Sequence, residues 1–162
     1  MSKSNILIVE DERITAEHIK QYLESLEYRI VEIAATGDQA IKAIHQHDVH
    51  LVIMDIKLKG EMDGIKTAQQ IQELQDVPII FLTAFADDFI LEKAKISDPF
   101  GYVLKPFGQK ELKIAVTMAL YKHGITSQLK ENEGRYRSLV EASPNSIFIH
   151  QDGKIIYANP AA

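Results

Sequence analysis

Short apolar runs alternate five times along the chain with longer stretches in which apolar residues recur every three or four positions. The short runs are typical of strands buried on both faces, and the longer stretches are typical of helices with one apolar face. This alternation predicts an α/β fold, a doubly wound five-stranded parallel sheet with helices on both faces and right-handed crossovers. The strands are predicted at 6–9, 29–34, 51–55, 77–82 and 101–104, and the helices at 15–26, 37–44, 65–74, 87–95 and 109–122.

Polar residues stand at the carboxyl ends of these strands. Glu10 and Asp11 follow the first strand, and Asp55 ends the third, which is a continuous apolar run. In a flavodoxin-like sheet of order 2-1-3-4-5 these two strands are neighbours, and ligands bind at this edge. Asp55 alone could equally be a loop residue or a helix N-cap, but two further strands also end in polar side chains. The residues expected to converge are Glu10, Asp11, Asp55, Thr83 and Lys105.

These residue types favour phosphoryl chemistry with a metal ion. Clustered carboxylates repel one another unless a cation lies between them, and hard oxygen ligands at an open edge suit Mg²⁺. Lys105 would place a positive charge beside a phosphoryl oxygen, and the Thr83 hydroxyl would offer another donor. Asp55 itself can act as a nucleophile and form an aspartyl phosphate.

Two other classes of protein with similar folds fit the sequence less well. A flavodoxin-type protein needs a Ser, Thr or Gly cradle for phosphate after the first strand, where the acidic run 10–12 would repel it. A phosphohydrolase with an Asp nucleophile usually needs a second acid nearby, but Lys57 stands two residues beyond Asp55. Because the chain has no Gly-rich nucleotide loop, we expect it to receive phosphate without drawing it from ATP.

The full set of motifs resembles the receiver domain of two-component response regulators over about residues 3–123. This resemblance implies that Asp55 accepts a phosphoryl group from a phosphohistidine on a histidine kinase or phosphotransfer protein, or from a small phosphodonor. It implies Mg²⁺-dependent self-phosphorylation and slow autodephosphorylation, not a stand-alone enzyme. The alternative is a protein-interaction domain independent of phosphorylation, against which the complete motif set argues. The motifs are Glu10-Asp11, Asp55, Thr83-Ala84 and Lys105-Pro106.

The same resemblance implies individual roles for the site residues. Thr83 and Lys105 would bind the phosphoryl group, and Tyr102, three residues before Lys105, would be the switch aromatic that moves with Thr83. The Lys105–Pro106 bond would be cis, as is usual in the family. The expected Mg²⁺ ligands are Glu10, Asp11, Asp55 and the backbone carbonyl of Lys57.

The character of the sequence changes after residue 123. Residues 124–141 are polar and charged with apolar residues at roughly heptad spacing, which predicts a helical linker. Residues 135–159 resemble the opening of a PAS sensory domain, and Asp152-Gly153 between two apolar runs predicts a hairpin. We therefore expect a receiver domain at 1–123, a linker at 124–141 and an N-terminal PAS fragment at 142–162, from a longer signalling protein in which the receiver controls an attached module.

Apolar residues outside the predicted core indicate self-association. Ile114, Met118 and Tyr121 form a second apolar stripe on the last receiver helix, so we expect a homodimer through this helix and the linker. A lone hairpin has no sheet to join. The apolar tail is therefore expected to be disordered or to pair with a second copy.

Composition narrows the class of protein further. The 162 residues carry a net charge of −5, which argues against direct contact with nucleic acid. The absence of Cys excludes disulfides and thiolate metal sites. Because no apolar stretch approaches the roughly 20 residues of a membrane span, and no signal peptide precedes the first strand, a cytoplasmic location is the default expectation.

Overall fold

The structure is a computed structural model that describes residues 3–84 and 101–161. The chain divides into two compact units, residues 1–123 and residues 124–162. The helix expected at 87–95 lies outside the described residues.

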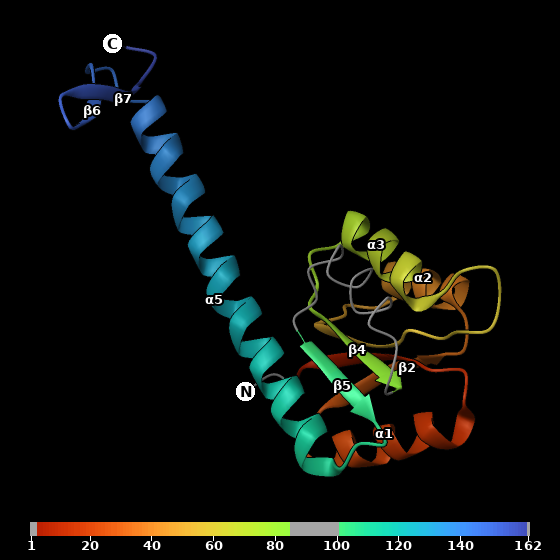
Figure 1. Cartoon of the computed structure of the whole chain (residues 1–162). Coiled ribbons are helices and arrows are strands. Elements are labelled where there is room, and N and C mark those ends of the chain that lie inside the picture. Colours follow the sequence, from red (N-terminus) through yellow and green to blue (C-terminus); the bar gives the residue numbers. More distant parts are fainter. Residues whose placement is uncertain (1–2, 85–100, 162) are drawn as a thin grey trace. The chain divides into compact units, whose positions relative to one another are not determined.

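The first unit is built on a five-stranded parallel sheet in the order β2-β1-β3-β4-β5, as predicted (Figure 1). All five residues of the central strand β3 are buried, which explains its uninterrupted apolar sequence. The alternating strand β2 lies at one edge and is only partly buried. The strands are β1 (Asn5–Val9), β2 (Arg29–Ala34), β3 (Leu51–Asp55), β4 (Ile79–Ala84) and β5 (Gly101–Lys105).

Helices cover both faces of this sheet and create two apolar cores. One core joins the sheet to α2 and α3, and the other joins it to α1 and the first turns of α5. Figure 1 shows α2 and α3 together on the face opposite α1. Side-chain caps start two helices, because Thr36 accepts from the Gln39 N–H and Asp63 from the Lys66 N–H. The helices are α1 (Arg13–Ser25), α2 (Gly37–Gln46), α3 (Gly64–Leu74) and α5 (Gln109–Glu141).

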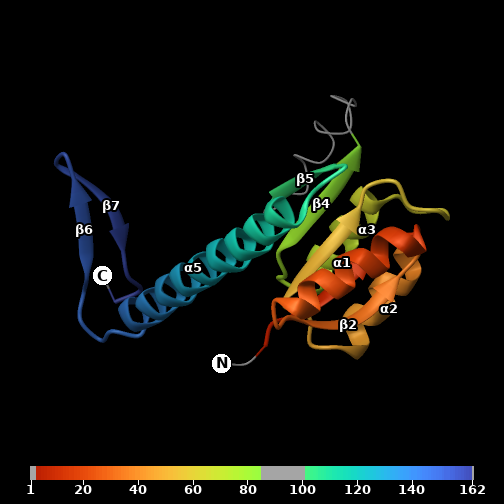
Figure 2. The ribbon, with the colours of Figure 1, turned by 90° about the horizontal axis from the view of Figure 1, so that it is seen from below.

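Helix α5 is longer than the last receiver helix predicted from the sequence. The predicted helix ends near residue 122 and a separate linker follows, whereas the structure has one helix from Gln109 to Glu141 (Figure 2). Gly124 and Gly134 lie within it, and each costs about 1 kcal/mol relative to Ala without forcing a break. The prolines that exclude helix stand outside, at Pro106 and Pro144.

The second unit contains the predicted hairpin, formed by β6 (Phe148–Gln151) and β7 (Lys154–Ala158). Asp152 and Gly153 take positive φ angles of 50° and 76°, as a tight two-residue turn requires. The tail is thus an ordered hairpin in the structure, which corrects the first of the two alternatives, disorder, whereas pairing with a second copy stays a prediction. Half or more of the side chain of Ile155 and of Ile156 stays exposed within this unit.

A buried amide explains why the hairpin is ordered. Asn159 is only 4% exposed, and its side-chain nitrogen donates to the carbonyl oxygens of Val140 and Asn145, both at 3.0 Å, and of Ser143 at 3.4 Å. Its side-chain oxygen accepts from the Ile147 N–H at 2.8 Å. One side chain therefore joins the end of α5, the following loop and the base of the hairpin.

Among the described residues, no helix has both the length and the apolar character needed to span a membrane.

Candidate functional site

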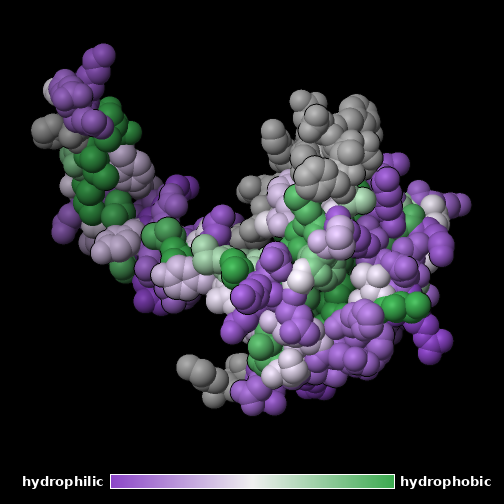
Figure 3. All heavy atoms as spheres, turned by 60° about the horizontal axis from the view of Figure 1, so that its bottom comes forward, coloured by the Kyte–Doolittle hydropathy of each residue, from purple (hydrophilic) through white to green (hydrophobic). Residues whose placement is uncertain are grey.

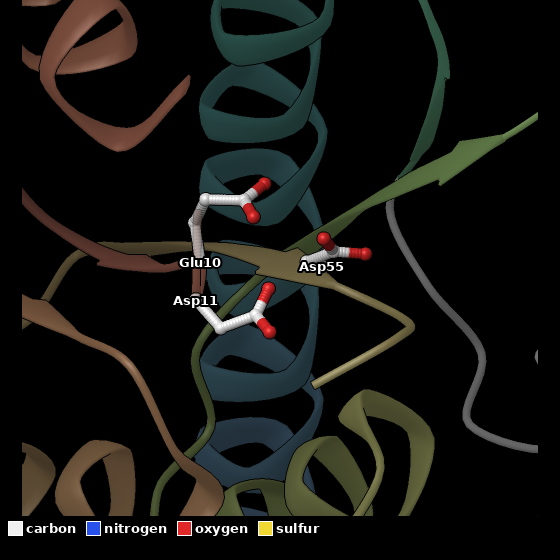
Figure 4. A group of neighbouring side chains, drawn as sticks. All are labelled: Glu10, Asp11 and Asp55. Carbon is white, nitrogen blue, oxygen red and sulfur yellow. The ribbon is translucent and has the colours of Figure 1, made fainter. Parts of the chain in front are cut away.

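The register between β1 and β3 brings three carboxylates together. Val9 pairs with Met54, so the residues that follow, Glu10 and Asp55, lie level at the carboxyl edge of the sheet. Asp11 completes the group, which we call the acidic cluster. One carboxylate oxygen from each residue lies within 4.8 Å of the others. Figure 4 shows the three side chains converging from the ends of the two strands.

Burial and backbone hydrogen bonds fix two of these carboxylates. Glu10 is 2% exposed and Asp55 is 7% exposed. Glu10 Oε1 accepts from the Glu12 N–H, and Asp55 Oδ1 accepts from the Lys57 N–H, both at 3.0 Å. Asp11 is more open. The acidic cluster is thus held in place by the local backbone and faces solvent on the side of Asp11.

Lys105 supplies the less exposed of two positive charges at the site, the other being Lys59, whose Nζ lies 3.7 Å from Asp11 Oδ2 and whose side chain is 83% exposed. Lys105 is the last residue of β5, and its Nζ donates to Glu10 Oε2 and Asp55 Oδ2, both at 2.7 Å. Burial lowers the pKa of Lys105, but the hydrogen bonds to Asp55 and Glu10 outweigh it and raise this pKa above the ordinary 10.5. Lys105 therefore stays charged at neutral pH and partly neutralises the acidic cluster.

At Glu10 the effect of burial on the pKa outweighs that of the hydrogen bonds, unlike at Lys105. Burial raises the pKa of its carboxyl above 4.5, and the neighbouring Asp55 charge adds to this, although hydrogen bonds from Lys105 and Glu12 oppose both. A carboxyl whose pKa is higher in the folded state binds more protons folded than unfolded. Its contribution to stability is therefore lost as the pH rises from 4.5 through the folded pKa.

We expect this loss of stability with rising pH to be measurable in metal-free solution. As the pH rises above 4.5, wild type should lose free energy of unfolding relative to Glu10→Gln, which cannot ionise. Urea unfolding in EDTA from about pH 5 to 8 measures the difference, and Glu24→Gln on the exposed face of α1 measures the effect of removing a surface charge. A constant difference between wild type and Glu10→Gln across this range would contradict the prediction.

Thr83 and Lys105 share a small cavity with Asp55. The cavity has a volume of about 90 Å³, and Thr83, which is 6% exposed, borders it near the end of β4. The Thr83 hydroxyl donates to the Ala84 carbonyl oxygen at 3.2 Å. The other residues that line the cavity are Ile56, Lys57 and Ala84. All five residues expected to converge therefore lie at this edge of the sheet, and their individual roles stay predictions.

Tyr102 lies on β5 and is 36% exposed. Its ring stacks on Phe81, with centroids 6.1 Å apart and planes inclined by 27°. The Lys105–Pro106 bond is cis, as the resemblance implies. The role of the Lys57 carbonyl as a metal ligand stays a prediction.

Two features of the site were not apparent from the sequence. The first is that Lys105 contacts both Glu10 and Asp55, because strand spacing alone does not show how far a Lys side chain reaches. The second is Gly64, whose N–H donates to the Ile56 carbonyl oxygen at 2.8 Å. A Cβ built on Gly64 would overlap the Asp55 carbonyl oxygen. The Asp63-Gly64 pair before a helix was the available signal for a turn packed against the strand end.

The comparisons with known proteins assign two parts of the chain to two families. The family "Response regulator receiver domain" matches residues 6–117, and the family "PAS domain" matches residues 134–162. The PAS match begins earlier than the boundary expected at residue 142, within the last turns of α5. These matches confirm the two resemblances inferred from the motifs.

Individual relatives cover the first part of the chain. The transcriptional regulatory protein PdtaR of Mycobacterium tuberculosis is 34% identical over 115 residues, 71% of this chain and 56% of that protein. The signal receiver domain of a modulated diguanylate cyclase from Desulfovibrio desulfuricans G20 has 32% identity and a TM-score of 0.73, covering 77% of this chain and 99% of that one. The N-terminal domain of a response regulator/sensory box/GGDEF protein from Carboxydothermus hydrogenoformans has 35% identity and a TM-score of 0.71, covering 76% of this chain and 99% of that one.

These relatives also correct one expectation. The chain spans about half the length of the curated relatives that it matches. Several of them are named transcriptional regulatory proteins, which does not fit the expectation of no direct contact with nucleic acid. That expectation relied on net charge, and charge over one part of a protein says nothing about domains outside it.

Proposed function

The chain belongs to the response regulator receiver domain family, and from this premise we propose that Asp55 is the phosphoacceptor of a two-component phosphorelay. The donor is a phosphohistidine on a histidine kinase or phosphotransfer protein, the partners with which receiver domains interact. The observation that carries the proposal is the double contact of Lys105, whose Nζ lies 2.7 Å from Asp55 Oδ2 and from Glu10 Oε2. This places a fixed positive charge beside the oxygen that would accept the phosphoryl group.

The transfer requires an oxygen nucleophile and compensation of negative charge. An oxygen of Asp55 forms a bond to phosphorus while the phosphorus–nitrogen bond of phosphohistidine breaks, and the electron pair of that bond stays with the imidazole. Lys105 and the Thr83 hydroxyl, which border the same cavity, bind oxygens of the transferred group. The cavity of about 90 Å³ is small, which suits a phosphoryl group better than a larger substrate.

The donor set of the acidic cluster fits Mg²⁺. Three carboxylates within 4.8 Å provide hard oxygen ligands, and the partly exposed Asp11 leaves an open side for water and phosphoryl oxygens. Glu10, Asp11, Asp55 and the Lys57 carbonyl would hold the ion. When bound, it would offset the negative charge of the carboxylates and of the phosphoryl group.

Phosphorylation would then act on Thr83 and Tyr102 as a two-state switch. The Thr83 hydroxyl, now bonded to the Ala84 carbonyl oxygen, would turn to a phosphoryl oxygen and vacate space beside β5. Tyr102, which is 36% exposed on that strand, would turn inward and bias an existing equilibrium between two conformations. We propose that this change acts on an attached sensory or output module, of which residues 142–162 are the N-terminal PAS fragment and 124–141 the linker. The second proposed partner is another copy of the chain, joined through α5.

Labelling with a small phosphodonor tests the phosphoacceptor role. Incubation with acetyl phosphate and Mg²⁺ should add one phosphoryl group to the intact mass, and chelation of the metal should slow this by about a hundredfold or more because charge compensation is lost. The control is the same incubation with Ca²⁺, whose longer bonds and higher coordination number suit this site less well. If no mass is added with Mg²⁺ present, the chain is a phosphorylation-independent interaction domain.

A fluorescent reporter tests the switch. The chain has no Trp, so Tyr102→Trp places its single indole at the switch position. Phosphodonor and Mg²⁺ should shift the emission to shorter wavelength as the ring becomes buried. Thr83→Ala in this background should label more slowly, because one donor to the phosphoryl group is lost, and the fully labelled protein should lose most of the shift. An emission spectrum that stays constant in a fully labelled sample would refute the switch.

A further inference from the structure

The last part of α5 carries a strict heptad of exposed side chains. Ile125, Leu129, Tyr136 and Leu139 are between 41% and 73% exposed, and Asn132 is exposed between them. Steps of four, three, four and three residues separate these five positions, which is the spacing of the core positions d, a, d, a and d of a heptad. Figure 3 shows apolar surface in this unit beside hydrophilic side chains. We call the row formed by these five side chains, Ile125, Leu129, Asn132, Tyr136 and Leu139, the linker seam.

The sequence around the linker seam gives the helix little stability of its own. Gly124 and Gly134 each cost about 1 kcal/mol relative to Ala. Two ion pairs, Glu131–Arg135 and Glu133–Arg137, each join residues one helical turn apart. Both are highly exposed and contribute at most about 0.3–0.5 kcal/mol each to helix stability. Helices of this kind are stable in water mainly when an apolar face packs against a partner.

The spacing and the polar residue indicate what that partner is. A 3.5-residue repeat matches a second helix that supercoils with the first, because only then does the same row of positions stay in contact. Asn132 occupies the central layer. In a parallel, in-register pair it faces Asn132 of the partner copy, and the two amides hydrogen-bond. In an antiparallel pair, d positions face a positions, so Asn132 would be buried against Leu129 or Tyr136 with its amide unsatisfied.

We therefore propose that residues 125–139 form a parallel, in-register, two-stranded coiled coil with a second copy of this chain, aligned by Asn132. The apolar stripe of Ile114, Met118 and Tyr121 does not continue the same register. Ile125 lies four residues after Tyr121 and Leu129 four after Ile125, so two steps of four interrupt the heptad there. This narrows the predicted homodimer surface to the linker seam.

Single cysteines test the orientation, because the chain has none of its own. Ile125→Cys and Leu139→Cys lie at the two ends of the seam, and Ser138→Cys lies on the outer face as control. With oxidised glutathione, both seam variants should form disulfide-linked dimers at least about tenfold more efficiently than the control, because in-register core positions bring two Cα atoms within disulfide range and outer positions do not. Cross-linking of neither seam variant, or of all three equally, overturns the proposal.

Sedimentation equilibrium tests the association itself. Leu129→Lys should weaken dimerisation by about a hundredfold or more, whereas Ser138→Lys should leave it unchanged. Thermal unfolding of the first unit, followed by near-ultraviolet circular dichroism, should be the same for both variants, which shows that a monomeric Leu129→Lys is still folded. Asn132→Leu should tighten the dimer but reduce cross-linking at residue 125, because the orientation is no longer specified. A wild-type chain that is monomeric at high concentration overturns the proposal, and none of these readouts depends on phosphorylation.

Discussion

Asp55→Asn is expected to abolish labelling by a phosphodonor, with a loss of more than about a thousandfold. An amide has nearly the shape of the carboxylate, so the side-chain oxygen still accepts the Lys57 N–H hydrogen bond that the structure shows at 3.0 Å. An amide oxygen is a far weaker nucleophile than a carboxylate oxygen, and the loss is therefore chemical and not structural. Intact-mass spectrometry over a time course measures it.

A matched variant separates this effect from general loss of acidic charge. Asp38→Asn removes one carboxylate from the exposed first turn of α2, far along the sequence from the cluster, and should label at the wild-type rate. Asp55→Asn should still unfold in one cooperative transition but lose some stability, because its amide nitrogen replaces the oxygen that accepts from Lys105 Nζ, which keeps only its bond to Glu10 Oε2. Equal labelling of Asp55→Asn and wild type would show that another residue is the acceptor.

Gly64→Ala should destabilise the first unit by about 3 kcal/mol and lower its melting temperature by about 10 °C. The new Cβ would overlap the Asp55 carbonyl oxygen and press on the Ile56 backbone. Main-chain atoms of a buried strand end cannot move aside as a flexible side chain can. Relief therefore requires the end of β3 or the start of α3 to shift, and labelling at Asp55 should fall in the same variant.

Gly101→Ala is the control for this prediction. Among the residues that the structure describes, a Cβ on Gly101, at the start of β5, meets nothing within 4 Å, so the change should alter stability by less than about 0.5 kcal/mol. Thermal unfolding and labelling of the two variants, measured side by side, separate a steric effect from the general effect of replacing Gly. A Gly64→Ala protein as stable as Gly101→Ala would contradict the packing described for this turn.

The sequence predicted the sheet well because burial leaves a direct mark on it. A strand buried on both faces, such as β3, must be apolar throughout, and its end is visible where Asp55 interrupts the run. The rules of connection and handedness gave a parallel sheet with right-handed crossovers, and the order 2-1-3-4-5 was that of the flavodoxin-like form of such sheets. The length of α5 did not follow, because Gly124 changes the local composition without ending the helix.

The site was predictable as a set of residues but not as a network. Strand ends and the family resemblance brought Glu10, Asp55 and Lys105 to one edge. The two simultaneous hydrogen bonds of Lys105 depend on side-chain reach and on the twist between β5, β1 and β3, which no spacing along the chain encodes. The contact between Gly64 and the end of β3 was hidden for the same reason.

The amide of Asn159 restricts how this part of the chain can change during evolution. It donates to three backbone carbonyls and accepts one N–H in a site that is 4% exposed. Asp lacks the donors, and Ser is too short to reach partners on both sides. Either replacement leaves buried polar groups without hydrogen-bond partners, so we expect each to destabilise the second unit. A descendant without the Asn would have to redesign the helix end, loop and hairpin together.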